Sequence, residues 1–304
     1  MQHEDLAICG LRVRSDLALP ELLPWTADAR GVDLVIELGD VPDRVSGAAE
    51  THPLIQVSAD GTCRFAMPEV AAFLVSPDGR AVTVAPSPGA TEADIRVFLL
   101  GTVFAIVCQR RGLLTLHACC VRAGSKAVAF AGDSGVGKST LAARLRARGH
   151  ALLTDDVTVV DMEAPGGPLV LPTFPRLKLW RDALESLGHT VDGAGAIRPG
   201  LDKYQLPLDD GFCNTPLPLA ALVRLDGNRK APEGLRLLDA VQGLGELGKV
   251  LYRPRLMLRL GTQARQMAQF LRLLSFVGGL RTLRRPETMA GWSEVEALLP
   301  VLAD

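Results

Sequence analysis

Residues Gly132–Ser139 read GDSGVGKS and carry the clearest chemical signature in the chain. They satisfy the pattern G-x-x-x-x-G-K-[ST], in which glycines let successive backbone N–H groups point inward at phosphate oxygens. The N-terminus of a following helix adds its partial positive charge. In this pattern the lysine reaches the β- and γ-phosphates and the hydroxyl can ligate Mg²⁺. The nucleotide-binding residues predicted from it are Gly132, Asp133, Ser134, Gly135, Val136, Gly137, Lys138, Ser139 and Thr140.

The elements around this loop are the ones that such a site needs. AVAFAG (127–132) is an apolar strand, KSTLAARLRARG (138–149) is a helix that ends at a glycine, and HALLTDD (150–156) is a second strand. Strand, loop, helix and strand form a βαβ unit with parallel pairing and a right-handed crossover.

Two adjacent acids, Asp155 and Asp156, close the second strand. Parallel strands end at the same edge of a sheet, so these carboxylates should share the edge that carries the loop. An acid is needed there to hold Mg²⁺, and neighbouring side chains of a strand point to opposite sides. One acid can serve the metal while the other faces a substrate. Alternatively, one of them only caps or turns the chain.

His117 is a further candidate. If LLTLHACCV (113–121) forms a hairpin with the apolar strand, Arg122 pairs with Ala127 and His117 falls opposite Gly132. An imidazole at that position could reach the γ-phosphate or an anionic substrate. The alternative is a core histidine whose hydrogen bonds are satisfied within an apolar strand.

Residues 116–161 resemble the catalytic core of the HPr serine kinase/phosphorylase family, which shows a histidine strand, a G-D-S-G-x-G-K-S loop, an RGH helix end and an aspartate pair in this order. The resemblance implies an α/β fold with a P-loop kinase core of HPr-kinase type. It implies that Asp155 is the base for the acceptor hydroxyl, that Asp156 supports Mg²⁺ with Ser139, and that Lys138 and His117 act at the phosphoryl group.

The wider chain is similar to the HPr-kinase-related proteins of bacterial peptide-modification clusters, among them lasso-peptide kinases that phosphorylate a serine of a precursor peptide. GLRVRSDLALPEL (10–22) and FPRLKLW (174–180) carry this similarity. FPRLKLW stands where the HPr-directed enzymes have a Glu-Val-Arg-Gly type signature, so HPr and a phosphorylase back-reaction are not implied. Arg176 and Lys178 within it are either phosphate or substrate contacts or solvated surface charges.

We therefore expect a kinase that uses ATP and Mg²⁺ and transfers the γ-phosphate to a serine hydroxyl of a peptide or protein. A small-molecule kinase acting on a sugar or nucleoside keeps the same core, because the choice of acceptor depends on loops such as 193–215. A nucleotide-binding regulator without transfer activity is the third alternative, and Asp155 argues against it as an acid beyond what metal binding needs.

Composition limits the remaining possibilities. The chain has 304 residues and a formal net charge of −1, which gives no reason to expect a nucleic-acid or membrane partner. The beginning of the sequence shows no signal pattern and no apolar run is long enough to span a membrane, so we expect a cytoplasmic protein. The six cysteines show no metal-binding spacing and are expected in the core. A homo-oligomer is possible, as in the related ring-forming kinases.

Turn-bounded extended segments fill the first 85 residues, and a break near PSPGATEAD precedes a helix with acidic residues early and arginines late. The predicted domains are a small β-rich N-terminal domain (1–88) and a catalytic domain (89–304).

Overall fold

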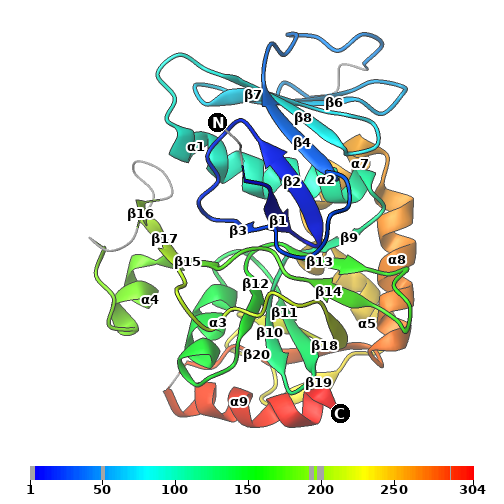
Figure 1. Ribbon diagram of the computed structural model, residues 1–304. Coiled ribbons are helices and arrows are strands. Elements are labelled where there is room, and N and C mark those ends of the chain that lie inside the picture. Colours follow the sequence, from blue (N-terminus) through cyan, green and yellow to red (C-terminus); the bar gives the residue numbers. More distant parts are fainter. Residues whose placement is uncertain (1–3, 49–51, 192–194, 197–201, 288) are drawn as a thin grey trace. The chain divides into compact units, whose positions relative to one another are not determined.

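The computed structural model describes residues 4–48, 52–191, 195–196, 202–287 and 289–304 (Figure 1). Its contacts divide the chain into two compact units: unit 1 is Met1–Leu113 with Pro254–Met267, and unit 2 is Leu114–Arg253 with Ala268–Asp304. Both combine strands and helices, so the expected α/β class is confirmed as a mixed α/β architecture with several sheets. The division differs from the expected boundary between 88 and 89, because the helices that follow residue 88 pack on the sheet of unit 1. Among the described residues, no helix has the length and apolar character needed to cross a membrane.

Unit 1 is built on an eight-stranded sheet in the order β3-β1-β2-β4-β8-β7-β6-β5. The extended segments expected in this region are strands. The apolar segment AAFLV also forms a strand, β7, which pairs antiparallel with β8. The strands are β1 (Leu6–Ile8), β2 (Leu11–Ser15), β3 (Leu23–Pro24), β4 (Leu34–Leu38), β5 (Ile55–Val57), β6 (Cys63–Met67), β7 (Ala71–Val75) and β8 (Ala81–Pro86).

The helix expected after residue 90 begins at a capping box. Thr91 accepts a hydrogen bond from the Asp94 backbone N–H, and Asp94 in turn reaches the Thr91 backbone. The helical segment comprises α1 (Glu92–Phe98), a π-helical turn (Leu99–Val103) and α2 (Phe104–Arg110). Its apolar side lies against β1, β2, β4 and β8. Unit 1 also contains α7 (Pro254–Leu260) and the start of α8 (Gln263–Phe276).

Unit 2 contains a nine-stranded mixed sheet in the order β12-β10-β11-β18-β14-β13-β9, with β20 beside β18 and β19 beside β20. β11 is parallel to β18 and β18 to β20, whereas β10 runs antiparallel to both β11 and β12. The strands are β9 (Leu114–Leu116), β10 (Ala118–Ala123), β11 (Lys126–Ala131), β12 (Leu152–Thr154), β13 (Thr158–Asp161), β14 (Leu169–Leu171), β18 (Leu217–Asp226), β19 (Leu235–Leu237) and β20 (Leu280–Arg284).

The predicted βαβ unit is therefore present with one correction. β11 and β12 run in the same direction, but they are not neighbours, because β10 lies between them and pairs with both. The reason is that β11 has β10 on one side and β18 on the other, so β12 joins the sheet at the remaining side of β10. β11, β12, β18 and β20 still end at the same edge of the sheet.

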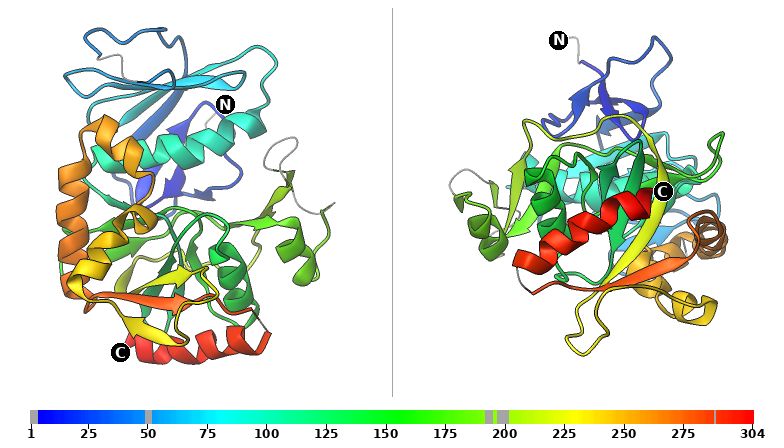
Figure 2. Two further views of the ribbon diagram at one scale, coloured as in Figure 1. Left: turned by 180° about the vertical axis from the view of Figure 1, so that it is seen from behind. Right: turned by 90° about the horizontal axis from the view of Figure 1, so that it is seen from below.

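Helices α3 (Lys138–Ala147) and α9 (Met289–Ala303) pack against β10 and β11 of this sheet (Figure 2). Their apolar side chains join those of the strands in one buried cluster that includes Phe130 and Leu141. All six cysteine residues are buried, as expected. The remaining helices of unit 2 are α4 (Arg181–Ser186), α5 (Ala240–Gly245) and α6 (Leu247–Val250), with the end of α8.

Two further expectations need correction. The predicted loop 193–215 contains β17 (Lys203–Pro207), which joins β15 (Arg176–Trp180) and β16 (Gly195–Ala196) in a three-stranded sheet; residues 193–194 and 197–201 lie outside the described residues. The second difference is at the end of α8. The spacing of apolar residues in AQFLRLLSFVGGLRTL (268–283) predicts a helix over the whole stretch. The helix instead stops at Phe276, because Gly278 and Gly279 adopt positive φ angles of 69° and 100°, and the chain continues as β20.

Candidate active site

The glycine-rich loop connects β11 to α3 as the sequence predicts. Its three glycines have φ angles of +139° (Gly132), +81° (Gly135) and +103° (Gly137), a backbone region that favours glycine. Gly137 occupies the N-cap of α3, and its carbonyl accepts the first helical hydrogen bond from Leu141. The orphan N–H groups of the first turn of α3 therefore lie where the loop ends. This arrangement suits an anion.

Gly132 has no room for a side chain. A Cβ there would lie 2.8 Å from the backbone oxygen of Leu225 in the neighbouring strand. At Gly135, a Cβ would meet nothing within 4 Å. Gly132 thus holds the loop close against β18.

We expect Gly132→Ala to destabilise the protein by about 1–3 kcal/mol more than Gly135→Ala, because both changes strain a positive φ but only the first adds a clash with backbone. Urea denaturation of the two variants measures the difference. Equal free energies of unfolding would contradict the close packing of the loop on β18.

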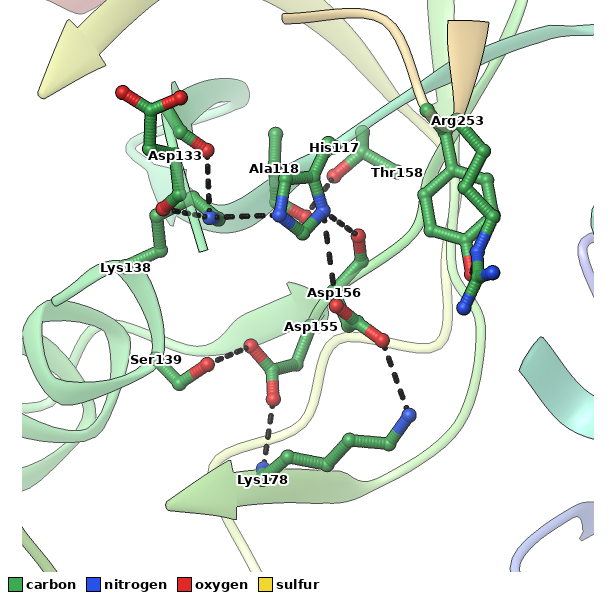
Figure 3. A network of polar contacts seen from close by, with 12 residues as sticks. His117, Ala118, Asp133, Lys138, Ser139, Asp155, Asp156, Thr158, Lys178 and Arg253 are labelled. Atoms are coloured by element: carbon green, nitrogen blue, oxygen red, sulfur yellow. Dashed lines mark hydrogen bonds and ion pairs between the residues drawn. The ribbon is translucent and has the colours of Figure 1, made fainter. Parts of the chain in front are cut away.

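Lys138 begins α3 and its side chain is buried, 6% exposed. Its Nζ donates hydrogen bonds to the carbonyls of Gly132 (2.7 Å) and Asp133 (2.9 Å). A third contact joins Nζ to Nε2 of His117 at 3.0 Å (Figure 3). Burial lowers the pKa of Lys138 from its ordinary value. The ammonium group is thereby held at the loop, next to the cavity described below.

His117 lies at a break between β9 and β10, which corrects the single strand expected over 113–121. The strand breaks here because the His117 N–H donates to the Val250 carbonyl at 2.7 Å instead of joining a neighbouring strand of the sheet. The β10–β11 register that predicted its position is confirmed, with Arg122 opposite Ala127 and Ala118 opposite Ala131.

The hydrogen bonds of His117 define its tautomer. An ammonium group only donates, so Nε2 accepts from Lys138, and the proton resides on Nδ1, 3.2 Å from the Asp156 carbonyl. Burial, and then the charge of Lys138, lower the pKa of His117. The imidazole is neutral at pH 7 and links the lysine to the strand end that carries the acids.

This lowered pKa makes stability depend on pH. Between the pKa of His117 in the folded protein and its ordinary value of 6.5, the unfolded chain binds more protons. The contribution of neutral His117 to the free energy of unfolding is therefore fully present above pH 6.5. It is lost as the pH falls through the pKa of His117 in the folded protein. We expect the free energy of unfolding to drop less steeply in His117→Gln than in the wild type as the pH falls below about 6.5, measured by urea denaturation. Parallel pH profiles would contradict the assignment.

Asp155 lies beneath the loop. Its Oδ1 accepts a hydrogen bond from the Ser139 hydroxyl at 2.7 Å, and its Oδ2 accepts one from the Lys178 backbone N–H of β15 at 2.7 Å. The residue is 9% exposed. Burial, followed by repulsion from Asp156, raises the pKa of this carboxyl. Both oxygens are therefore held by the protein, one of them at the hydroxyl predicted to ligate Mg²⁺.

Asp156 faces a different set of groups. Its backbone has a φ of +72°, which aspartate tolerates better than most residues. Its Oδ2 lies 3.0 Å from Nζ of Lys178, and its Oδ1 lies 3.7 Å from Nδ1 of His117. Burial alone would raise its pKa, but burial is outweighed by the charge of Lys178, then by that of His117 once low pH has protonated the ring, and by that of Lys203, so the pKa is lowered. Asp156 is a carboxylate over the whole physiological pH range.

A cavity of about 640 Å³ opens above these residues. Of the predicted residues it is lined by Ser134, Gly135, Gly137, Lys138, Ser139, Thr140, His117 and Asp156. Asp155 does not line it but touches Ser139, which does. Gly132 and Val136 belong to the loop but are buried and do not line the cavity. The Asp133 carboxylate points away from the polar network around Lys138 and His117 (Figure 3).

Sequence reasoning missed most of the remaining wall of the cavity. Lys178, one of the two cations of FPRLKLW, lines it, whereas Arg176 is 4% exposed and contacts Gln205 and the Phe174 ring. Trp180 and Lys203 line the cavity from β15 and β17, and Arg285 and Trp292 line it from the C-terminal segment. Lys203, Arg285 and Trp292 belong to no sequence motif, since each reaches the cavity only through the tertiary fold.

The oxygen atoms of Ser139 and Asp155 fit a Mg²⁺ ion, which prefers oxygen ligands and keeps several water and phosphate oxygens in its shell. In the described part of the chain, no group of three or more His, Cys, Asp or Glu side chains could hold a metal on its own.

The likenesses to known proteins lie among solved structures. No protein-family model matches the chain, and no curated protein matches it. Among solved structures, the HPr(Ser) kinase/phosphatase from Coxiella burnetii aligns with 52% of this chain and 97% of its own, at 18% identity and a TM-score of 0.28. A likeness at this score carries no weight for function, which is inferred below from the site itself.

Proposed function

We propose that the protein is an ATP- and Mg²⁺-dependent kinase that transfers the γ-phosphate to a serine hydroxyl of a peptide or protein, such as a ribosomally made precursor peptide. The observation that carries the proposal is the hydrogen bond from Ser139 to Asp155 beneath the loop, with a second carboxylate, Asp156, facing the same cavity. A regulator that only binds nucleotide needs the first acid and has no use for the second.

The positions of the two acids support an exchange of the roles that the resemblance implies. Asp155 touches the metal-ligating hydroxyl and has both oxygens occupied, so it would hold Mg²⁺ with Ser139. Asp156 lines the cavity and is the acid that an acceptor hydroxyl can approach. The raised pKa of Asp155 would favour it as the base, but that shift arises from burial and from repulsion, and a bound cation removes both effects.

The reaction then needs few groups. The acceptor oxygen forms a bond to the γ-phosphorus, the bond from phosphorus to the β–γ bridging oxygen breaks, ADP leaves, and the hydroxyl proton passes to Asp156. The transition state is loose, so a weakly basic carboxylate suffices when it orients the hydroxyl in line. Lys138 and the N–H groups of the first turn of α3 hold the phosphates, and Lys178 keeps Asp156 in place through its ion pair. Mg²⁺, when bound, neutralises charge on the β- and γ-phosphates.

Room for a peptide acceptor supports this choice of substrate. Beyond Asp156 the cavity continues along Lys178, Trp180 and Lys203, which come from two paired strands. Trp180 is 40% exposed there, and its ring is 5.8 Å from the Lys203 ammonium. An exposed aromatic side chain on a strand is a suitable contact for the side chains that flank an acceptor serine.

Mass spectrometry of a transfer assay tests the proposal. Purified protein with ATP and Mg²⁺ is offered serine-containing precursor peptides, the same peptides with serine replaced by alanine, and HPr. We expect a phosphate-sized gain on the serine peptides only, abolished by Asp156→Asn. A gain on HPr alone would replace the peptide by HPr as the acceptor. Nucleotide binding without transfer to any peptide would refute the peptide kinase.

A further inference from the structure

The loops that follow β18 and β20 lie at the sheet edge on one side of the glycine-rich loop, and Asp155 and Asp156 lie on the other side. The strand order here is β12-β10-β11-β18-β20. Asp155 and Asp156 follow β12, two places from β11 in one direction, and Arg285 follows β20, two places from β11 in the other. At the usual strand spacing each lies about 10 Å to one side of β11. A nucleotide whose γ-phosphate faces the acids must extend its nucleoside toward β18 and β20.

Arg285 lies directly against the loop on that side. Its Nε is 3.5 Å from the position that a Cβ on Gly137 would take, and its backbone N–H donates to the Asp226 carbonyl at 2.7 Å. The neighbouring charged side chains form ion pairs with other residues: Arg284 pairs with Glu233, and Glu287 pairs with Arg229. Among the described residues, no carboxylate forms an ion pair with Arg285, which leaves its guanidinium for a ligand.

Trp292 completes the same wall. Its ring reaches within 3.6 Å of the Gly137 Cβ position, and the Arg144 guanidinium lies 5.7 Å from the ring centroid. A second cavity of about 170 Å³ adjoins this wall and shares Arg285 and Glu287 with the large one. The wall thus offers a cation, an indole and adjoining space beside the start of α3.

We propose that the C-terminal segment forms the nucleoside subsite of the enzyme, with Arg285 binding the α-phosphate and Trp292 packing against the nucleoside. This inference rests on the proposed nucleotide site but not on the identity of the acceptor. The chemistry suits a nucleoside triphosphate: an arginine fork matches phosphate oxygens, and an indole packs well on a base or a ribose.

Binding titrations with two probes test it. The probes are the non-hydrolysable β,γ-methylene analogue of ATP and inorganic pyrophosphate, which lacks a phosphate at the α-position, each with Mg²⁺. The variants are Arg285→Gln and, as the matched control for loss of one positive charge, Arg281→Gln, since Arg281 lies on β20 and lines neither cavity. We expect Arg285→Gln to weaken binding of the analogue by about 10-fold or more, which is typical for loss of a charge-assisted hydrogen bond, and binding of pyrophosphate by less than about 3-fold. Arg281→Gln should leave both affinities within about 3-fold.

The outcomes separate the possibilities. Equal loss for both probes would place Arg285 at the β- and γ-phosphates and overturn the subsite, and an absence of loss for either probe would overturn it too. Selective loss together with an absence of peptide phosphorylation would leave the subsite standing while the proposed kinase fails. In protein with Trp25 and Trp180 replaced by phenylalanine, the analogue should quench the fluorescence of Trp292 and pyrophosphate should not. Identical spectra with both probes would remove Trp292 from the subsite.

Discussion

Asp156→Asn is expected to lower kcat by ~10²–10⁴-fold while changing the affinity for MgATP by less than ~3-fold. The side chain lines the cavity, pairs with the Lys178 ammonium group and lies 3.7 Å from His117 Nδ1, whereas the Ser139 hydroxyl, predicted to ligate Mg²⁺, bonds to Asp155. Loss of the negative charge removes the group that orients and deprotonates the acceptor. Steady-state kinetics with a serine peptide, together with calorimetric titration of MgADP, separate the two effects.

Asparagine is a well-matched replacement at this position. The backbone of Asp156 has a φ of +72°, and asparagine tolerates this conformation about as well as aspartate does. The variant therefore keeps the backbone and removes only the charge. Thermal unfolding checks that the loss of the ion pair with Lys178 has not unfolded the site.

Asp155→Asn provides the contrast. Because Asp155 accepts the Ser139 hydrogen bond, this change should raise the Mg²⁺ concentration required for half-maximal activity, and Ser139→Ala should do the same. The two residues share one hydrogen bond, so their effects should be less than additive in the double variant. If instead Asp155→Asn abolished turnover at saturating Mg²⁺ and Asp156→Asn raised the Mg²⁺ requirement, the original assignment, with Asp155 as the base, would be correct.

The parts of this site that depend on local spacing were accessible from the sequence. The loop Gly132–Ser139 follows an apolar strand and opens a helix, so its position and its orientation follow from the motif alone. The position of His117 followed from counting along a hairpin closed at Gly124, and the observed register agrees with that count. Both predictions depend on short-range geometry, which varies little within a strand or a tight turn.

Properties that depend on tertiary neighbours were not accessible. Which acid touches Ser139 depends on how the chain turns after Thr154, and the positive φ of Asp156 has no distinct signal in the residues TDD. The three-stranded sheet that brings Lys203 to the cavity forms between segments more than twenty residues apart. Arg285 and Trp292 reach the loop from the C-terminal segment because β20 pairs with β18, a parallel pairing that neither strand predicts by itself.

The second large effect is expected at Lys138. Lys138→Ala should weaken MgATP at least ~10-fold and lower kcat by ~10²–10³-fold, because a preorganised cation at the phosphates is lost. In the free protein the ammonium group is bound by two loop carbonyls and by His117 Nε2, so nucleotide binding must exchange these contacts for phosphate oxygens. Titration calorimetry with MgADP and single-turnover transfer to a serine peptide measure the two losses. Lys138→Arg should not restore activity, since a planar fork cannot replace a compact ammonium group among these three acceptors.

The same variant tests the link between lysine and histidine. The charge of Lys138 is the second cause, after burial, of the lowered pKa of His117, so Lys138→Ala should raise that pKa toward its ordinary value. NMR titration of the His117 ring protons in the two proteins measures this change, and His150, 26% exposed at its side chain, serves as an internal control. An unchanged pKa of His117 would separate it from Lys138. Its neutral form would then result from burial alone, and its contact with the loop would have no part in phosphate binding.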